Sequence, residues 1–76
     1  MRIEKIEPRG DYTIKIKLDN GKSGLFNVKP YLQYEAFHEL KKISAFKQVV
    51  NGNYFIEWAC GADLSIDTIM AHLQIQ

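Results

Sequence analysis

Residues 56–73 read IEWACGADLSIDTIMAHL, and this stretch is expected to decide the fold. Its pattern predicts a strand that ends at Trp58, a turn through Gly61 and Asp63, and a closing helix that starts at Ile66. The only tryptophan of the chain therefore falls at a strand exit, shortly before a glycine-containing turn. These residues indicate local structure rather than a catalytic site. The structure that they predict is a small α+β protein.

Two polar residues mark the start of the closing helix. Ser65 suits the N-cap position, where its hydroxyl accepts a hydrogen bond from a free amide of the first turn. Asp67 places a negative charge near the positive end of the helix dipole. The apolar side chains expected to face the core are Ile66, Ile69, Met70 and Leu73.

A hairpin is expected directly before this stretch, because residues 51–53 read Asn-Gly-Asn between the apolar segments 49–50 and 54–58. Alternation along a strand then assigns its side chains to two faces. One face carries Tyr54, Ile56 and Trp58, and the other carries Phe55 and Glu57.

The N-terminal third predicts three strands. Residues 2–7 form the first, which ends at Pro8 because proline cannot continue a central ladder. Residues 12–18 alternate between apolar and polar side chains, and the Asn20-Gly21 turn joins them to a strand within 22–28.

Two registers are open for this first hairpin. A two-residue turn would set Lys15 opposite Phe26, whereas a three-residue loop with Gly21 in the left-handed conformation sets Ile14 opposite Phe26. The second register gathers the apolar side chains on one face, and it is the one we expect.

Short helices are expected between the two hairpins. Pro30 suits the first turn of one helix. Residues 34–43 place Phe37 and Leu40 at the three-residue spacing of a second helix, and Ser44 suits the cap of a further single turn.

Length and composition restrict the class of protein. A chain of 76 residues fits one domain, expected over residues 1–76, and its 46% hydrophobic content is ordinary for a globular protein. No apolar run approaches the roughly 20 residues of a membrane span, and residues 1–6 lack the apolar block of a signal peptide. The single cysteine fits a reducing compartment, so we expect a cytoplasmic protein.

Charge is unevenly distributed along the chain. Residues 1–30 carry seven basic and four acidic side chains, whereas residues 48–76 carry three acidic side chains and no lysine or arginine. Such polarity can orient contact with a charged partner. Lys15, Lys17 and Lys22 form the one local basic patch, which is a possible interaction site for nucleic acid or a solvated sheet face.

The candidates for catalysis are Cys60, His38 and His72. The charges nearest to Cys60 in the sequence are acidic, and they disfavour the thiolate that a nucleophile requires. Both histidines are expected at the surface. No Cys/His cluster has metal-binding spacing and no glycine-rich phosphate loop is present, so we expect no metal and no cofactor.

Taken together, these blocks resemble domain-of-unknown-function family 2442 over nearly the whole chain. The most specific block is Trp58 with Gly61, Ala62, Asp63, Leu64 and Ser65, and weaker ones are residues 10–12, 19–21, 26–28 and 30–32. The chain departs from the usual family pattern at Ala59-Cys60, where Pro-Asn is common, and at Asn27, which is often aspartate. These differences alter the turn chemistry and leave the strand–turn–helix plan intact.

The resemblance implies an α+β fold, with a small antiparallel sheet of about five strands and helices packed on it in the order ββ β α(α) ββ α. It also implies a bacterial, cytoplasmic protein without established catalytic residues. Members of this family are sometimes joined to a helix-turn-helix domain or encoded beside small toxin-like proteins, which implies an antitoxin-like or regulatory role by association.

Three functions follow as hypotheses. The leading one is a non-enzymatic protein-interaction module with a protein partner and no membrane contact. The alternatives are a nucleic-acid-associated regulator that uses the basic sheet face, and an enzyme that uses Cys60 or a histidine. Self-association is a further possibility, because an open sheet has edge strands to cover.

Overall fold

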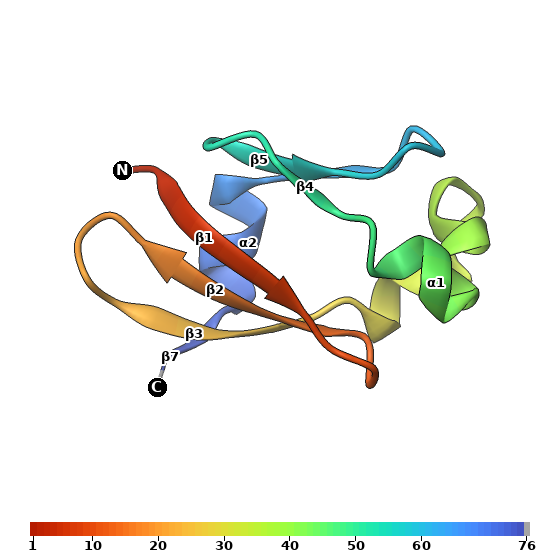
Figure 1. Ribbon diagram of the computed structural model, residues 1–76, viewed down its shortest axis with the longest axis horizontal. Coiled ribbons are helices and arrows are strands. Elements are labelled where there is room, and N and C mark those ends of the chain that lie inside the picture. The colour runs from red at the N-terminus through yellow and green to blue at the C-terminus, as the bar shows by residue number, and fades with distance from the viewer. Residues whose placement is uncertain (76) are drawn as a thin grey trace.

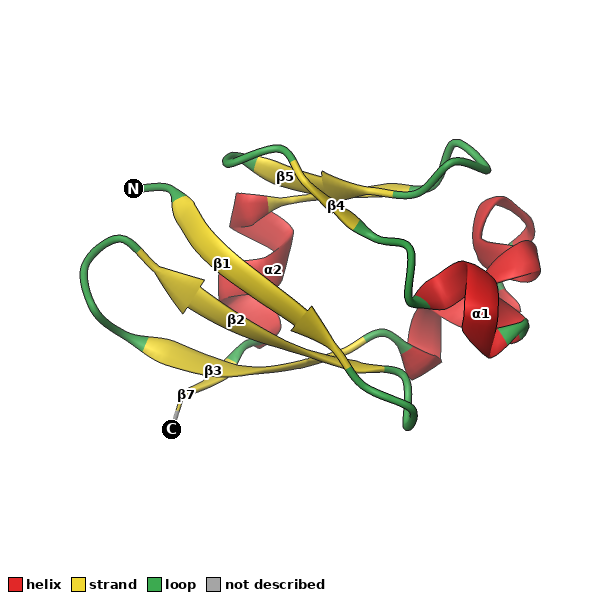
Figure 2. Ribbon diagram, viewed as in Figure 1, coloured by secondary structure: helices red, strands yellow, loops and turns green. Residues whose placement is uncertain are grey.

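The computed structural model describes residues 1–75 and shows two antiparallel sheets, one longer α-helix and a group of short helices (Figures 1 and 2). The elements in chain order are β1 (Ile3–Pro8), β2 (Thr13–Leu18), β3 (Ser23–Asn27), η1 (Lys29–Gln33), η2 (Glu35–Lys41), α1 (Ile43–Phe46), β4 (Val50–Asn51), β5 (Phe55–Glu57), β6 (Asp63–Ser65), α2 (Ile66–His72) and β7 (Gln74–Ile75). The predicted α+β class is confirmed, with the strands divided between two sheets.

The larger sheet has the strand order β1-β2-β3-β7, and the smaller one has the order β4-β5-β6. Two hydrogen bonds join the sheets where β1 passes the β4–β5 hairpin. The backbone N–H of Ile3 donates to the Asn53 carbonyl at 2.7 Å, and the side-chain amide of Asn51 donates to the Ile3 carbonyl at 3.1 Å. Helix α2 then leads from β6 of one sheet to β7 of the other, so it lies behind the strands in Figure 1.

The first hairpin has the predicted three-residue register. Ile14 lies opposite Phe26 and Lys15 lies opposite Leu25. Gly21 has φ +88°, and its N–H donates to the Leu18 carbonyl at 3.0 Å, as a left-handed loop residue requires. Because this register keeps Ile14, Ile16 and Phe26 on one face, all three are fully buried.

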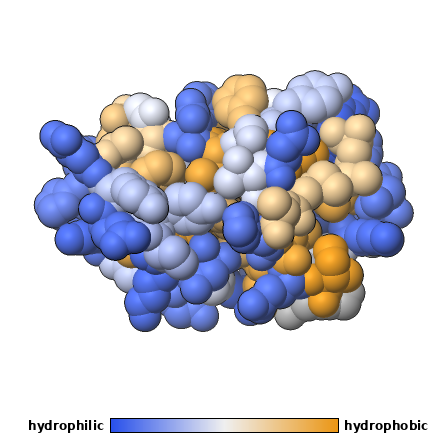
Figure 3. Space-filling model, turned by 180° about the vertical axis from the view of Figure 1, so that it is seen from behind, coloured by the Kyte–Doolittle hydropathy of each residue, from blue (hydrophilic) through white to orange (hydrophobic). Residues whose placement is uncertain are grey.

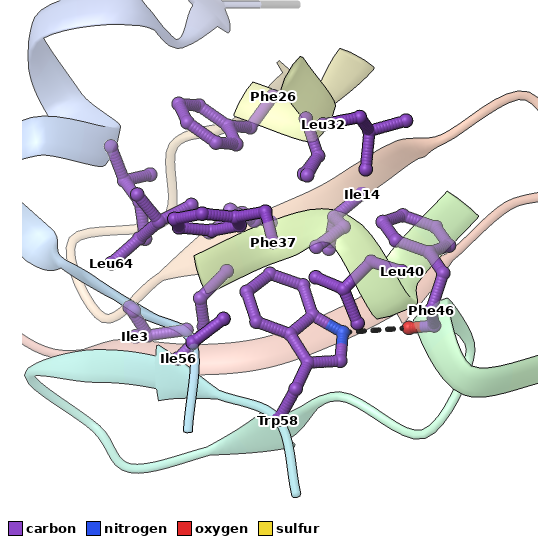
Figure 4. Packing of buried hydrophobic residues seen from close by; sticks show 14 of the residues in the cluster. Ile3, Ile14, Phe26, Leu32, Phe37, Leu40, Phe46, Ile56, Trp58 and Leu64 are labelled. Atoms are coloured by element: carbon purple, nitrogen blue, oxygen red, sulfur yellow. Dashed lines mark hydrogen bonds between the residues drawn. The ribbon is translucent and has the colours of Figure 1, made fainter. Parts of the chain in front are cut away.

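The core lies between the two sheets, α2 and the short helices (Figure 4). Trp58 is 3% exposed, and its indole N–H donates to the Phe46 carbonyl at 2.8 Å. Its ring stacks on Phe46 and meets the edge of Phe37, at centroid separations of 6.2 and 6.1 Å. The tryptophan thus fixes the short helices against the smaller sheet, which explains why the 56–73 stretch holds the fold together.

The short helices were predicted in the right places, although their geometry differs from the α-helix expected for residues 34–43. Segments η1 and η2 are 3₁₀ helices, and Phe37 and Leu40 point into the core as expected. The prediction that Ser44 caps the following turn is wrong. Lys42 occupies the N-cap of α1 without a side-chain hydrogen bond, and Ser44 lies within the helix and is exposed.

Several details of the 54–75 region also differ from expectation. Asp63 lies in strand β6 rather than in a turn, and residues 74–75 form an additional strand, β7. Tyr54 is 58% exposed because it lies in the turn before β5, so it does not share the buried face of Ile56. Met70 is 44% exposed, whereas Ile69 is fully buried and anchors α2. The predicted N-cap is confirmed, since the Ser65 hydroxyl accepts a hydrogen bond from the Thr68 N–H.

Candidate functional site

The strongest candidate surface is the outer face of the smaller sheet. Alternation sends Ile56 and Leu64 into the core, and it sends Val50, Phe55, Glu57 and Asp63 outward, where all four are exposed. Strand pairing joins them, because Val50 lies opposite Glu57 and Glu57 lies opposite Asp63. We call the surface formed by Val50, Phe55, Glu57 and Asp63 the acidic–apolar face.

Glu57 and Asp63 are close neighbours on this face. The Trp58 N–H donates to the Ala62 carbonyl at 2.9 Å, so the adjacent Glu57–Asp63 pair occupies a non-hydrogen-bonded position of the ladder. Side chains at such positions lie closest together, and like charges placed directly opposite destabilise a sheet. The two ion pairs found within residues 1–75 are Arg2–Asp19 and Lys17–Glu4, so neither carboxylate of this pair is neutralised there.

Phe55 supplies an exposed aromatic surface on the same face as the two carboxylates. Its ring lies against the backbone of Gly52, where even a single added methyl group would overlap it. The ring thus packs over the Gly52 backbone on one side and is 39% exposed. Val50 extends the apolar surface on the neighbouring strand and is 53% exposed. The face therefore combines exposed apolar groups with two carboxylates that form no ion pair within residues 1–75.

The predicted basic patch is brought together only in part. Lys15 and Lys17 line a shallow hollow of about 240 Å³ on the outer face of the larger sheet, together with Lys5, Glu7 and Ser23. Lys17 forms an ion pair with Glu4 at 3.4 Å, and Lys15 lies opposite Glu7. Lys22 lies in the β2–β3 loop, outside this hollow. Acidic neighbours thus reduce the positive charge that a phosphate backbone would require.

Most residues of the family block, by which we mean Trp58, Gly61, Ala62, Asp63, Leu64 and Ser65, have a structural role. Trp58, Ala62 and Leu64 are buried, and Gly61 has φ +96° in the β5–β6 turn, a conformation that favours glycine. Ser65 caps α2. Asp63 is the exception, because it is exposed on a strand and, within residues 1–75, does not form an ion pair.

The candidate catalytic residues lie on three segments: Cys60 in the β5–β6 turn, His38 on η2 and His72 on α2. Cys60 is exposed, and its thiol points to the Ala36 carbonyl at 3.8 Å. It lines a small hollow of about 80 Å³ whose walls contain Glu39 but no histidine. His38 is exposed on η2, and His72 is exposed at the end of α2. Within residues 1–75, no group of three or more His, Cys, Asp or Glu side chains is placed to hold a metal ion.

Two further surfaces carry exposed apolar groups. A groove of about 300 Å³ is lined by Asn27, Pro30, Tyr31, Gln33, Tyr34 and His72. The view from behind, the side on which α2 lies, shows an interrupted band of apolar side chains among hydrophilic ones (Figure 3). Exposed apolar residues of α2 and β7 are Met70 and Ile75. Neither surface combines its apolar groups with a facing pair of unneutralised charges, as the acidic–apolar face does.

Sequence reasoning found half of the acidic–apolar face. It placed Phe55 and Glu57 on the face opposite Ile56, which is confirmed. It missed Val50 and Asp63 as their neighbours, because Asp63 was expected in a turn. The signal that could have found it is the alternation Asp63-Leu64-Ser65, in which a single apolar residue stands between two polar ones.

The fold and surface define a small α+β protein in which two antiparallel sheets and one crossing helix enclose a single core. The chain belongs to the family described as "Protein of unknown function (DUF2442)", whose family model matches residues 3–74. We found no significant match among curated proteins or among solved structures. Within residues 1–75, no helix combines the length and the apolar character that a membrane crossing requires.

Proposed function

We propose that this chain is a non-enzymatic protein-interaction module that binds a protein partner through the acidic–apolar face. One observation carries the proposal: Glu57 and Asp63 lie opposite each other and form no ion pair with any residue of 1–75, on the same face as the exposed ring of Phe55. Aromatic side chains are frequent anchors of protein interfaces, because they bury a large apolar area on binding. A like-charge pair that costs stability in the free protein is explained if a partner compensates it.

The non-enzymatic part of the proposal is supported by the surroundings of the three candidate catalytic residues. His38 lies on η2, Cys60 in the β5–β6 turn and His72 on α2, and the hollow beside Cys60 contains no histidine that could activate the thiol. The family context extends the proposal to a bacterial, cytoplasmic protein with an antitoxin-like or regulatory role, in which binding controls the activity of the partner. The basic sheet face gives less support to a nucleic-acid partner, because Glu4 and Glu7 lie among its lysines.

Affinity capture with paired surface variants tests this proposal. The wild type, Phe55→Ser and Tyr34→Ser proteins are immobilised and exposed to extract from the organism that encodes the chain. Tyr34 is a matched control, because it is an exposed aromatic residue (56%) on a different surface. The expected result is one protein that is retained by the wild type and by Tyr34→Ser, and that is lost from Phe55→Ser. Equal retention by all three proteins, or no specific retention by the wild type, would contradict the proposal.

A further inference from the structure

We infer that the partner presents an arginine side chain to the acidic–apolar face, within a segment that also carries apolar residues. This inference rests on the proposed function and names the chemistry of the partner. Charge complementarity is the first argument. Residues 48–75 contain three acidic side chains and no lysine or arginine, so this end of the chain attracts cations and repels anions.

The spacing of the two carboxylates favours one shared cation. Directly opposed side chains of a non-hydrogen-bonded pair have Cβ atoms about 4.5 Å apart. A planar guanidinium has five N–H donors in a fixed arrangement, so it can donate to Glu57 and Asp63 at the same time. Its binding removes the repulsion between the two carboxylates and replaces it with charge-assisted hydrogen bonds. A lysine ammonium offers three donors around a point charge and fits this bridging role less well.

The apolar half of the face also selects arginine over lysine. Phe55 lies on the same strand and the same face as Glu57, and Val50 lies opposite Glu57 on the other side. A guanidinium stacks on an aromatic ring more readily than an ammonium does, and the aliphatic part of an arginine side chain packs on apolar neighbours. An apolar residue next to the arginine would cover the remaining exposed surface of Phe55 and Val50.

A second copy of this chain fits the face less well than a separate partner does. The strand lysines of the larger sheet lie beside Glu4 and Glu7, so they already have acidic neighbours. A contact between two different faces of the same chain would also be heterologous, and such contacts continue into open assemblies unless the rotation closes a ring. Self-association through this face is one outcome of the test below.

The test is an NMR titration of the whole chain with capped model peptides. The probe is an acetylated and amidated Arg-Leu-Arg-Leu peptide, compared with the same peptide in which citrulline replaces arginine. Citrulline retains the shape of arginine and lacks its charge. We expect saturable shifts of the Phe55, Glu57 and Asp63 amides with the arginine peptide, and at least about tenfold weaker binding of the citrulline peptide. A lysine peptide is expected to bind with intermediate affinity.

Two double variants make the titration specific. Glu57→Gln/Asp63→Asn should weaken the arginine peptide by at least about tenfold, whereas Glu4→Gln/Glu7→Gln, which changes two exposed glutamates of the larger sheet, should leave its affinity unchanged. Equal binding of the citrulline peptide, shifts confined to the larger sheet, or concentration-dependent broadening of the acidic–apolar face without peptide would each overturn the inference.

The same double variant separates the two proposals in affinity capture. In one outcome, a partner is lost from Phe55→Ser and is still retained fully by Glu57→Gln/Asp63→Asn. That result would support the proposed interaction face and contradict the inference that the partner binds it through an arginine. If no partner depends on Phe55, the proposed function itself fails, whatever the peptides show.

Discussion

Glu57 and Asp63 face each other across β5 and β6, so two carboxylates occupy directly opposed positions on an exposed sheet face. Like charges in this arrangement destabilise a sheet, and cross-strand pairs typically contribute about 0.2–1 kcal/mol. The sequence around them is otherwise well suited to its structure, with a tryptophan in the core, a capped helix and a glycine at φ +96°. A local conflict within a consistent fold is a common sign of a functional surface.

Replacing one member of this pair should stabilise the free protein. Glu57→Lys converts the like-charge pair into an opposite-charge pair, and we expect the free energy of unfolding to rise by about 0.2–1 kcal/mol. Glu7→Lys is the matched control, because Glu7 lies opposite Lys15 and its replacement creates a like-charge pair. Urea unfolding measures both. A destabilised Glu57→Lys protein would show that the carboxylate has a favourable role in the fold itself.

Trp58 is expected to contribute more to stability than any surface residue does. Trp58→Ala removes a buried ring together with its hydrogen bond to the Phe46 carbonyl, and we expect a loss of about 3–5 kcal/mol in chemical denaturation. Trp58→Phe retains most of the packing and leaves that carbonyl without its donor, which should cost about 1–3 kcal/mol. A loss below about 1 kcal/mol for Trp58→Ala would be incompatible with the buried position.

Gly21 offers a test of the hairpin register that is free of packing effects. A side chain at Gly21 would have open space around it, so the cost of Gly21→Val arises from the left-handed backbone at φ +88°. We expect a loss of about 1–3 kcal/mol, measured from the thermal midpoint and unfolding enthalpy. Gly10→Val is the control, since Gly10 is equally unobstructed and lies outside the left-handed region. Equal midpoints for the two variants would contradict the three-residue loop.

Asp11 gives a prediction about pH. The Thr13 hydroxyl donates to the Asp11 carboxylate, and this bond, assisted by the Thr13 backbone N–H, holds the pKa of Asp11 below its ordinary value of 3.8. A lowered folded-state pKa stabilises the protein above pH 3.8, and this contribution is lost as the pH falls through the folded-state pKa. Thr13→Val should therefore raise the Asp11 pKa toward 3.8 in an NMR titration of the carboxyl group. An unchanged pKa would exclude the hydroxyl as the main cause.

Local sequence signals predicted the elements whose residues determine their own conformation. Alternation in residues 12–18 and a glycine suited to positive φ predicted the first hairpin and its register. Ser65 likewise predicted the start of α2. The missed strands, β6 and β7, have only three and two residues, and they exist because β5 and β3 lie beside them. Such pairing is a tertiary effect, and the three-residue alternation of β6 is too short to predict it by itself.

The same reason explains which part of the candidate site was predictable. Phe55 and Glu57 follow from alternation within one strand. Val50 and Asp63 join them only through pairing with two neighbouring strands, one of which has no clear sequence signature. Lys22 is an example of residues that are close in the sequence and do not share a site. It lies near Lys15 and Lys17 in the sequence, but outside the hollow that those two lysines line.

Site-specific photo-crosslinking in the native organism tests whether the acidic–apolar face binds a protein partner. A benzophenone amino acid replaces Val50 on the acidic–apolar face in one protein and Lys17 on the larger sheet in another; both native side chains are exposed. We expect illumination to join a discrete protein partner to position 50 and not to position 17, and we expect Glu57→Gln/Asp63→Asn to remove this product. A partner that crosslinks at position 17 and not at position 50 would contradict the account.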